Sequence, residues 1–93
     1  MTDKATRVVI EGRVQGVWFR GWAAGEAARL NIRGWIRNRR DGSVEAVFAG
    51  AADDVDAIVE ACRKGPLAAR VDALTRYPAD DPEDEGFRHL RTA

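Results

Sequence analysis

The amino-acid sequence changes from an extended segment to a helix within the stretch RVVIEGRVQGVWFR, residues 7–20. Residues 7–13 carry apolar side chains on both faces, Val8 and Ile10 on one and Val9 on the other. A central strand of a sheet shows this pattern, because both of its faces are covered. The sequence therefore predicts that residues 7–13 form an interior strand.

The rest of this stretch predicts a loop and a helix. Residues 14–18 form a segment that is too short to continue the strand and is interrupted by Gly16. From there apolar residues recur at helical spacing, at Phe19, Ala23, Ala27 and Leu30. Asn31 tolerates the left-handed conformation that ends many helices, so we expect the helix to end there.

A β-hairpin follows. Residues 34–39 and 43–49 are two extended runs joined by Arg40-Asp41-Gly42, and Asp-Gly between such runs is a strong hairpin signal. In the second run the side chains of Val44, Ala46 and Phe48 face one side.

A second helix and two further strands complete the chain. Asp53 or Asp54 can cap a helix whose apolar stripe is Val55, Ile58, Val59 and Cys62, and Gly65-Pro66 ends it. In residues 69–77, Val71, Ala73, Thr75 and Tyr77 alternate with Arg70, Asp72 and Arg76, which predicts a strand with one solvent-facing side. Residues 80–86 form an acidic loop, and residues 87–90 a short closing strand.

The order strand, helix, strand, strand, helix, strand, with a short terminal strand, fits one fold class. It is the split βαβ, ferredoxin-like α+β sandwich, in which two helices cover one face of an antiparallel sheet. No internal repeat or linker interrupts it, so we expect a single domain over residues 1–93. This architecture hosts many functions, so the function must be argued from a site.

Composition excludes several classes of protein. The 93 residues are 45% hydrophobic, which is too apolar for a disordered chain, and no apolar run approaches the roughly 18 residues of a membrane span. The first residues contain Asp3 and Lys4 and no secretory signal, and the single cysteine allows no internal disulfide. We expect a soluble, cytoplasmic monomer with no membrane partner.

The charge distribution points to an anionic ligand rather than to nucleic acid. The net charge is zero, which argues against the basic field of a nucleic-acid-binding protein. Residues 1–50 carry nine Lys and Arg against five Asp and Glu, whereas residues 51–93 carry six against ten. An anion is therefore expected to bind the first half of the chain.

Residues 12–20, between the first strand and the first helix, have the features of a phosphate-binding loop. Gly12 and Gly16 allow close backbone approach, consecutive N–H groups can converge on an anion, and a helix N-terminus follows. Arg20 adds a permanent charge with a planar fork. The loop lacks the Lys-Ser/Thr pair of a P-loop. Glycines at such a turn also have a purely conformational explanation.

Two motifs in order resemble the acylphosphatase family. The first is IEGRVQGVWFR, residues 10–20, and the second is GWIRN, residues 34–38, followed by Gly42, Val44 and Gly50. The resemblance covers residues 7–90, and the fold read from the pattern of elements agrees with that of the family.

The resemblance implies hydrolysis of the carboxyl-phosphate anhydride of a small acyl phosphate, giving a carboxylate and inorganic phosphate without metal or cofactor. By motif position, Arg20 binds the phosphate and Asn38 orients the attacking water. The remaining loop residues contact substrate: Gly12, Arg13, Val14, Gln15, Gly16, Val17, Trp18 and Phe19.

The chain departs from the family's usual pattern at three positions. Asn31 replaces a common glycine at the helix end, Ile36 a smaller residue, and His89 an aliphatic residue of the terminal strand. None of the three touches the implied chemistry. We expect His89 to affect only the packing of the C-terminal strand.

The implied roles make chemical sense. An acyl phosphate has a good leaving group, so an enzyme needs chiefly to hold the phosphoryl oxygens and to place a water in line. The neutral amide of Asn38 can accept from that water and donate to it without adding a negative charge beside the phosphate.

Several of these residues also have a plain structural explanation. Asn38 near a hairpin is by default a turn residue, and Arg20 a surface cation, although a cation at a helix start opposes the helix dipole.

Cys62 lies on the apolar stripe and is expected in the core rather than as a nucleophile. Among the tryptophans, Trp18, Trp22 and Trp35, only Trp18 adjoins the loop and could line an acyl pocket. Arg37, Arg39 and Arg40 are expected to form a solvated rim.

Other functions remain open to different degrees. A non-catalytic ferredoxin-like module could bind a phosphate-bearing ligand, but an RNA-recognition module would need an RNP1-like string, which the chain lacks. A metal carrier would need a Cys-x-x-Cys pair. A free-standing version of the acylphosphatase-like part of a larger carbamoyl-transfer maturation protein is a third reading. The acyl group of the substrate is not fixed by the sequence.

Overall fold

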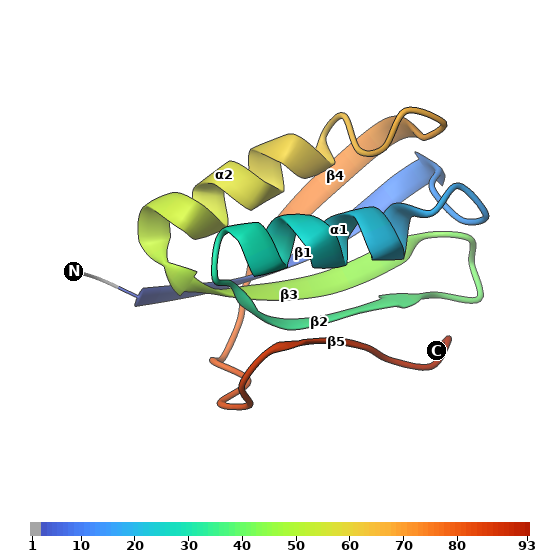
Figure 1. Ribbon diagram of the computed structural model, residues 1–93. Helices are drawn as coiled ribbons and strands as arrows, with labels where there is room; N and C mark the ends of the chain where they lie inside the picture. The colour runs from blue at the N-terminus through green and yellow to red at the C-terminus, as the bar shows by residue number, and fades with distance from the viewer. Residues whose placement is uncertain (1–2) are drawn as a thin grey trace.

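The computed structural model describes residues 3–93 as one sheet with two helices. The strands are β1 (Asp3–Arg13), β2 (Arg33–Asn38), β3 (Val44–Ala51), β4 (Arg70–Pro78) and β5 (Phe87–His89), and the helices are α1 (Phe19–Arg29) and α2 (Ala52–Cys62). The sheet has the order β4-β1-β3-β2-β5, and both helices pack on the same face (Figure 1). The predicted ferredoxin-like α+β sandwich is confirmed.

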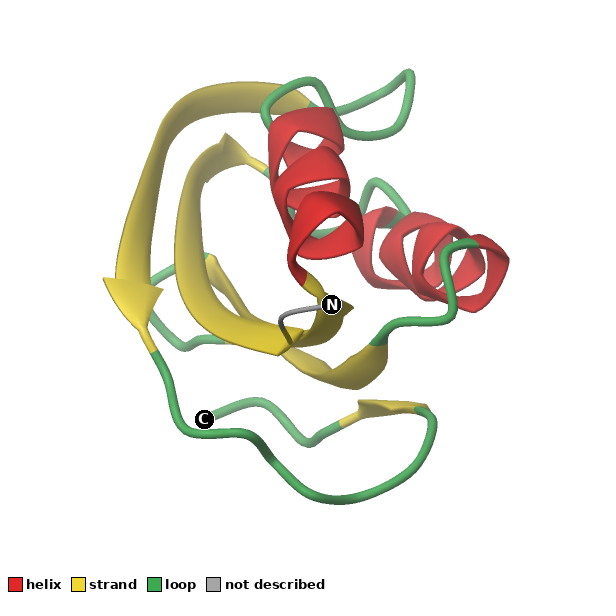
Figure 2. Cartoon of the chain, turned by 90° about the vertical axis from the view of Figure 1, so that its left-hand side faces the viewer, coloured by secondary structure: helices red, strands yellow, loops and turns green. Residues whose placement is uncertain are grey.

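One edge of the sheet differs from the predicted antiparallel arrangement. β5 pairs parallel with β2, which makes the sheet mixed, while the other pairs are antiparallel. The reason is the connection from β4, which crosses one end of the sheet and brings the chain to the opposite edge (Figure 2). Beyond β5 the Ala93 N–H still donates to the Asn38 carbonyl, at 3.0 Å, so the pairing with β2 continues.

The core lies between the sheet and the helices. The predicted inward faces are confirmed, because the following side chains are all fully buried: Val8 and Ile10 of β1, Val44, Ala46 and Phe48 of β3, and Val55, Ile58, Val59 and Cys62 of α2. The core thereby fixes α1 and α2 against the central strands. Within residues 3–93, no helix is long and apolar enough to cross a membrane.

The predicted N-terminal cap of α2, Asp53 or Asp54, is wrong. The helix begins at Ala52 directly after β3, the cap position is Ala51, and no side chain caps it. Asp53 and Asp54 lie in the first turn instead. There their charges still favour the positive end of the helix dipole, which explains why acidic residues occur at this point.

The face predicted for β4 is also wrong beyond its first residues. The pairing of β1 with β4 shifts between Glu11 and Gly12, so one extra residue is inserted opposite this point. A bulge reverses the side-chain alternation. As a result Leu74 packs against the core, whereas Ala73, Thr75 and Tyr77 are exposed.

We expect alanine substitutions at two glycines to change the free energy of unfolding in opposite directions. A Cβ on Gly34 of β2 would lie 1.9 Å from the Val47 carbonyl oxygen, and its φ is +136°. Gly34→Ala should therefore lower the free energy of unfolding by about 1–3 kcal/mol. Gly25, inside α1, has open space around it, and Gly25→Ala should raise it by about 0.5–1 kcal/mol. Urea denaturation measures both, and equal effects of the two substitutions would contradict this assignment.

Candidate active site

The loop between β1 and α1 contains two left-handed residues, Gly16 (φ 72°) and Trp18 (φ 65°). Tryptophan rarely takes this conformation, and here the Trp18 carbonyl accepts the first helical hydrogen bond, from the Trp22 N–H at 3.0 Å. α1 then begins at Phe19 with no side-chain cap. The N–H groups of its first turn consequently have no partners within the helix, and the positive end of the helix dipole lies at the loop.

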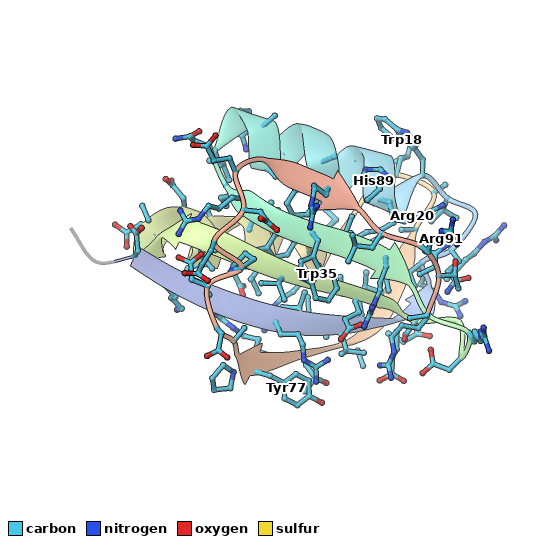
Figure 3. All side chains as sticks on the ribbon, turned by 90° about the horizontal axis from the view of Figure 1, so that it is seen from below. Trp18, Arg20, Trp35, Tyr77, His89 and Arg91 are labelled. Atoms are coloured by element: carbon cyan, nitrogen blue, oxygen red, sulfur yellow. The ribbon has the colours of Figure 1, made fainter. Side chains whose placement is uncertain are left out.

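A cavity of about 220 Å³ lies where this loop and α1 meet β2 and β5. It is lined by Val14, Gly16, Trp18, Phe19, Arg20, Gly21, Asn38 and His89. Figure 3 shows Trp18, Arg20 and His89 at the end of the molecule where α1 begins. The cavity thus combines the first turn of a helix, a cation and a carboxamide.

Arg20 is half-buried in the wall of this cavity. Eight other arginines pair with carboxylates, among them Arg33 with Asp81 and Arg76 with Asp56. Within residues 3–93, Arg20 makes no ion pair and no side-chain hydrogen bond. Its planar fork is therefore available to an anion.

Asn38 is the last residue of β2, and its backbone is held from both sides. It pairs with Val44 of β3, and its carbonyl accepts the Ala93 N–H. Asn38 lies two residues after the buried Ile36, so its side chain is on the same, helix-covered face. Among the described residues no side chain or backbone group hydrogen-bonds its carboxamide, which is thus free to bind a small molecule.

Gln15 has a structural role that the sequence analysis did not identify. Its Nε2 donates to the Arg39 carbonyl at 2.7 Å and to the Ser43 carbonyl at 2.8 Å, which ties the loop to the β2–β3 hairpin. Asp41 fixes Ser43 in turn by accepting from its hydroxyl and N–H, and these hydrogen bonds hold the pKa of Asp41 below its ordinary value. Gln15 lies outside the cavity lining, and so do Gly12, Arg13 and Val17.

Gly12, Arg13 and Val17 lie away from the cavity. Gly12 lies at the bulge, where a Cβ would come within 2.2 Å of the Arg70 carbonyl oxygen. Arg13 is exposed at the end of β1, and Val17 is buried in the core. The cavity therefore uses only part of the predicted loop.

Trp18 forms an exposed rim of the cavity. Its side chain is 71% exposed, and its indole lies against Gly21, where a Cβ would be 2.1 Å from the indole Nε1. Gly21 is a lining residue that no sequence pattern pointed to, because helical spacing alone does not mark it. The two other tryptophans lie elsewhere: Trp22 packs edge-on against Phe19, and Trp35 lies beneath the guanidinium of Arg37.

His89 is the second lining residue that the sequence analysis missed. We expected it to affect only strand packing, but it borders the same cavity as Arg20 and Asn38. Its register partner Ile36 explains the placement, since the parallel β2–β5 pair sets His89 beside the end of β2. Because His89 is far from the loop in the sequence, no local pattern indicates that the two lie close together.

Two further predictions concern residues away from the cavity. Cys62 is buried in the core, as predicted, and burial raises its pKa to about 12, so it is a thiol rather than a nucleophile at neutral pH. Arg37 does not join the predicted rim, because it donates to the buried Glu45 on the opposite face of the sheet at 2.7 Å. Within residues 3–93 no group of three or more His, Cys, Asp or Glu side chains is placed to hold a metal ion.

The family model for acylphosphatases matches residues 6–89. The chain belongs to the acylphosphatase family. An acylphosphatase of Nitrobacter hamburgensis is 60% identical over 78 residues, which are 84% of this chain and 79% of that relative. The family predicted from the two motifs is thereby confirmed.

Solved structures support the same conclusion. An acylphosphatase from Coxiella burnetii superimposes with a TM-score of 0.90 at 30% identity, over 95% of this chain and 93% of that one. Full-length HypF, in a phosphate- and nucleotide-bound form, matches with a TM-score of 0.89 over 98% of this chain but only 12% of its own. At 22% identity the likeness to HypF shows the shared fold alone.

Proposed function

We propose that this acylphosphatase binds the phosphoryl group of an acyl phosphate in the cavity at the start of α1 and hydrolyses its carboxyl-phosphate anhydride. One observation carries the assignment: Arg20 and Asn38 border the same cavity, and neither side chain has a partner within residues 3–93. Polar groups without partners beside a cavity are suited to bind a ligand.

The phosphoryl oxygens are held by two kinds of donor. Arg20 supplies a charged, two-pronged contact, and the N–H groups at the start of α1 supply uncharged donors on the positive end of the helix dipole. Gly16 and Trp18, both left-handed, curve the loop so that its backbone borders the cavity. These groups are in place before the substrate arrives, so charge stabilisation needs no rearrangement.

Asn38 orients the attacking water from the β2 side of the cavity. Its carboxamide oxygen accepts from the water while its NH₂ group can donate, which fixes the direction of attack. No carboxylate lines the cavity within residues 3–93, so the water approaches the phosphorus without a repelling charge. The water oxygen bonds to phosphorus as the bond from phosphorus to the acyl oxygen breaks. The carboxylate leaves with the electron pair, and the proton that the water loses passes to a phosphate oxygen.

No metal or cofactor is needed for this chemistry, because the leaving group is a stabilised carboxylate and Arg20 neutralises the phosphoryl charge. The decisive experiment incubates the purified protein with an aromatic acyl phosphate in excess chelator and follows the loss of anhydride absorbance. We expect turnover to persist, and to exceed turnover of p-nitrophenyl phosphate. Binding of phosphate without turnover would show a non-catalytic module, and restoration of activity only by added metal would contradict the metal-free mechanism.

We predict that Arg20→Gln removes most activity and weakens competitive inhibition by inorganic phosphate. A charge-assisted hydrogen bond contributes about 1.5–3 kcal/mol, so the inhibition constant should rise at least about tenfold. Arg20→Lys should restore this only partly, because the planar fork is lost. Arg29→Gln, at the exposed far end of α1, is the matched control. Unchanged phosphate inhibition in Arg20→Gln would place the anion elsewhere.

We predict that Asn38→Ala lowers kcat and leaves inhibition by phosphate nearly unchanged, because the water contact matters mainly in the transition state. By comparison with oxyanion sites, kcat should fall on the order of 10²–10³, which is about 2.7–4 kcal/mol. Asn38→Asp should in addition weaken phosphate inhibition, since it places a carboxylate beside the anion. A folded Asn38→Ala variant with near-parental turnover would assign Asn38 to the turn alone.

A further inference from the structure

His89 stands at the cavity on the strand opposite the loop. In the parallel β2–β5 pair it is in register with Ile36, which is fully buried under α1. Side chains in register lie on the same face, so His89 is on the helix-covered side, one step along the ladder from Asn38. The cavity lining contains Arg20, Asn38 and His89 together, from three different elements.

The side chains that line the cavity beside His89 are cationic or neutral. β5 packs against α1 and β2. At the cavity α1 presents Arg20, and β2 presents the uncharged Ile36 and Asn38. On its own strand Arg88 is on the opposite face, in register with Trp35, and pairs with Asp84 at 3.1 Å.

Two residues beyond His89 the chain carries Arg91, which Figure 3 shows at the same end of the molecule. Within residues 3–93 the imidazole of His89 makes no hydrogen bond or ion pair with another side chain, and no carboxylate lines the cavity. A protonated His89 therefore has no carboxylate side chain in the cavity to pair with, and an entering anion can take that place.

We propose that His89 is a second, pH-dependent cation of the anion site, binding the phosphoryl group together with Arg20. The inference rests on the proposed function, because it uses the same cavity. Histidine is the side chain whose charge ordinarily changes between about pH 5 and 8, whereas Arg20 stays charged throughout. The site thus holds one permanent positive charge and one that depends on pH.

A linked proton uptake follows from this arrangement. A bound anion stabilises the charged form of a histidine side chain, so we expect anion binding to be accompanied by a proton uptake that depends on His89. The affinity for an anion of constant charge must then fall as the pH rises through the range in which a histidine side chain ordinarily loses its proton. A residue that only packs β5 against α1 would produce neither effect.

Sulfate is the suitable probe, because it stays a dianion from about pH 5.5 to about pH 8.5, whereas inorganic phosphate itself titrates in this range. Titration calorimetry gives the dissociation constant of sulfate across that range for the parent protein, His89→Gln and Arg88→Gln. His89→Gln keeps a hydrogen-bond donor and removes the titration. Arg88→Gln removes a neighbouring charge on the other face, so it is the matched control.

We expect the parent protein to bind sulfate about two- to fivefold more tightly at the acidic end, the range for an exposed charge pair. Arg88→Gln should behave like the parent, and His89→Gln should lose the pH dependence. Repeating the titration near neutral pH in buffers of different ionisation enthalpy measures how many protons are taken up when sulfate binds. We expect proton uptake for the parent protein and none for His89→Gln. Arg20→Gln should weaken sulfate binding at every pH, which places the anion in this cavity.

Equal pH dependence in the parent protein and His89→Gln, or no proton uptake by the parent, would overturn the inference. The same samples are assayed for acyl phosphate hydrolysis. Turnover without a His89-linked pH dependence refutes only the role of His89. A His89-linked pH dependence without turnover refutes the proposed hydrolysis and leaves the anion site standing.

Discussion

The amide nitrogen of Gln15 donates to the carbonyl oxygens of Arg39 and Ser43, at 2.7 and 2.8 Å. These two hydrogen bonds join parts of the chain that the sheet ladder does not connect: the loop that precedes Arg20, and the hairpin that begins just after Asn38. A displacement of about 1 Å between reacting groups can cost on the order of 100-fold in rate. We therefore infer that the proposed positions of anion and water depend on this contact.

Charge is distributed so that the site keeps an unpaired cation in a chain of zero net charge. On the face of the sheet away from the helices, the buried carboxylate of Glu45 accepts from Arg7 at 2.9 Å and from Arg37 at 2.7 Å. These two arginines stabilise a buried negative charge, so their own positive charges are already paired and do not serve a ligand. On the helix side, Arg20 faces a cavity whose lining contains no acid within residues 3–93.

Local patterns predicted much of this structure. The hairpin at Asp41 and the left-handed residue Asn31, with φ 56°, follow from turn chemistry, and the buried faces of the central strands follow from alternation. The predictions that failed concern residues whose positions depend on strand pairing with segments distant in the sequence. The bulge that reverses β4 arises in its pairing with β1 at Gly12, and His89 reaches the cavity only because β5 pairs parallel with β2. The motifs selected Arg20 and Asn38, whose roles in the reaction are proposals.

A double-mutant cycle between Gln15 and Asn38 measures whether Gln15 positions Asn38 against the phosphate site. Gln15→Met keeps the length of the side chain and removes both hydrogen bonds. We predict that Asn38→Ala lowers kcat far less in the Gln15→Met background than in the parent, with a coupling free energy of about 1–3 kcal/mol, because a misplaced Asn38 contributes little to catalysis. Circular dichroism checks that each variant is folded. Losses of kcat that simply add, with both variants folded, would contradict the claim that Gln15 positions Asn38 against the phosphate site.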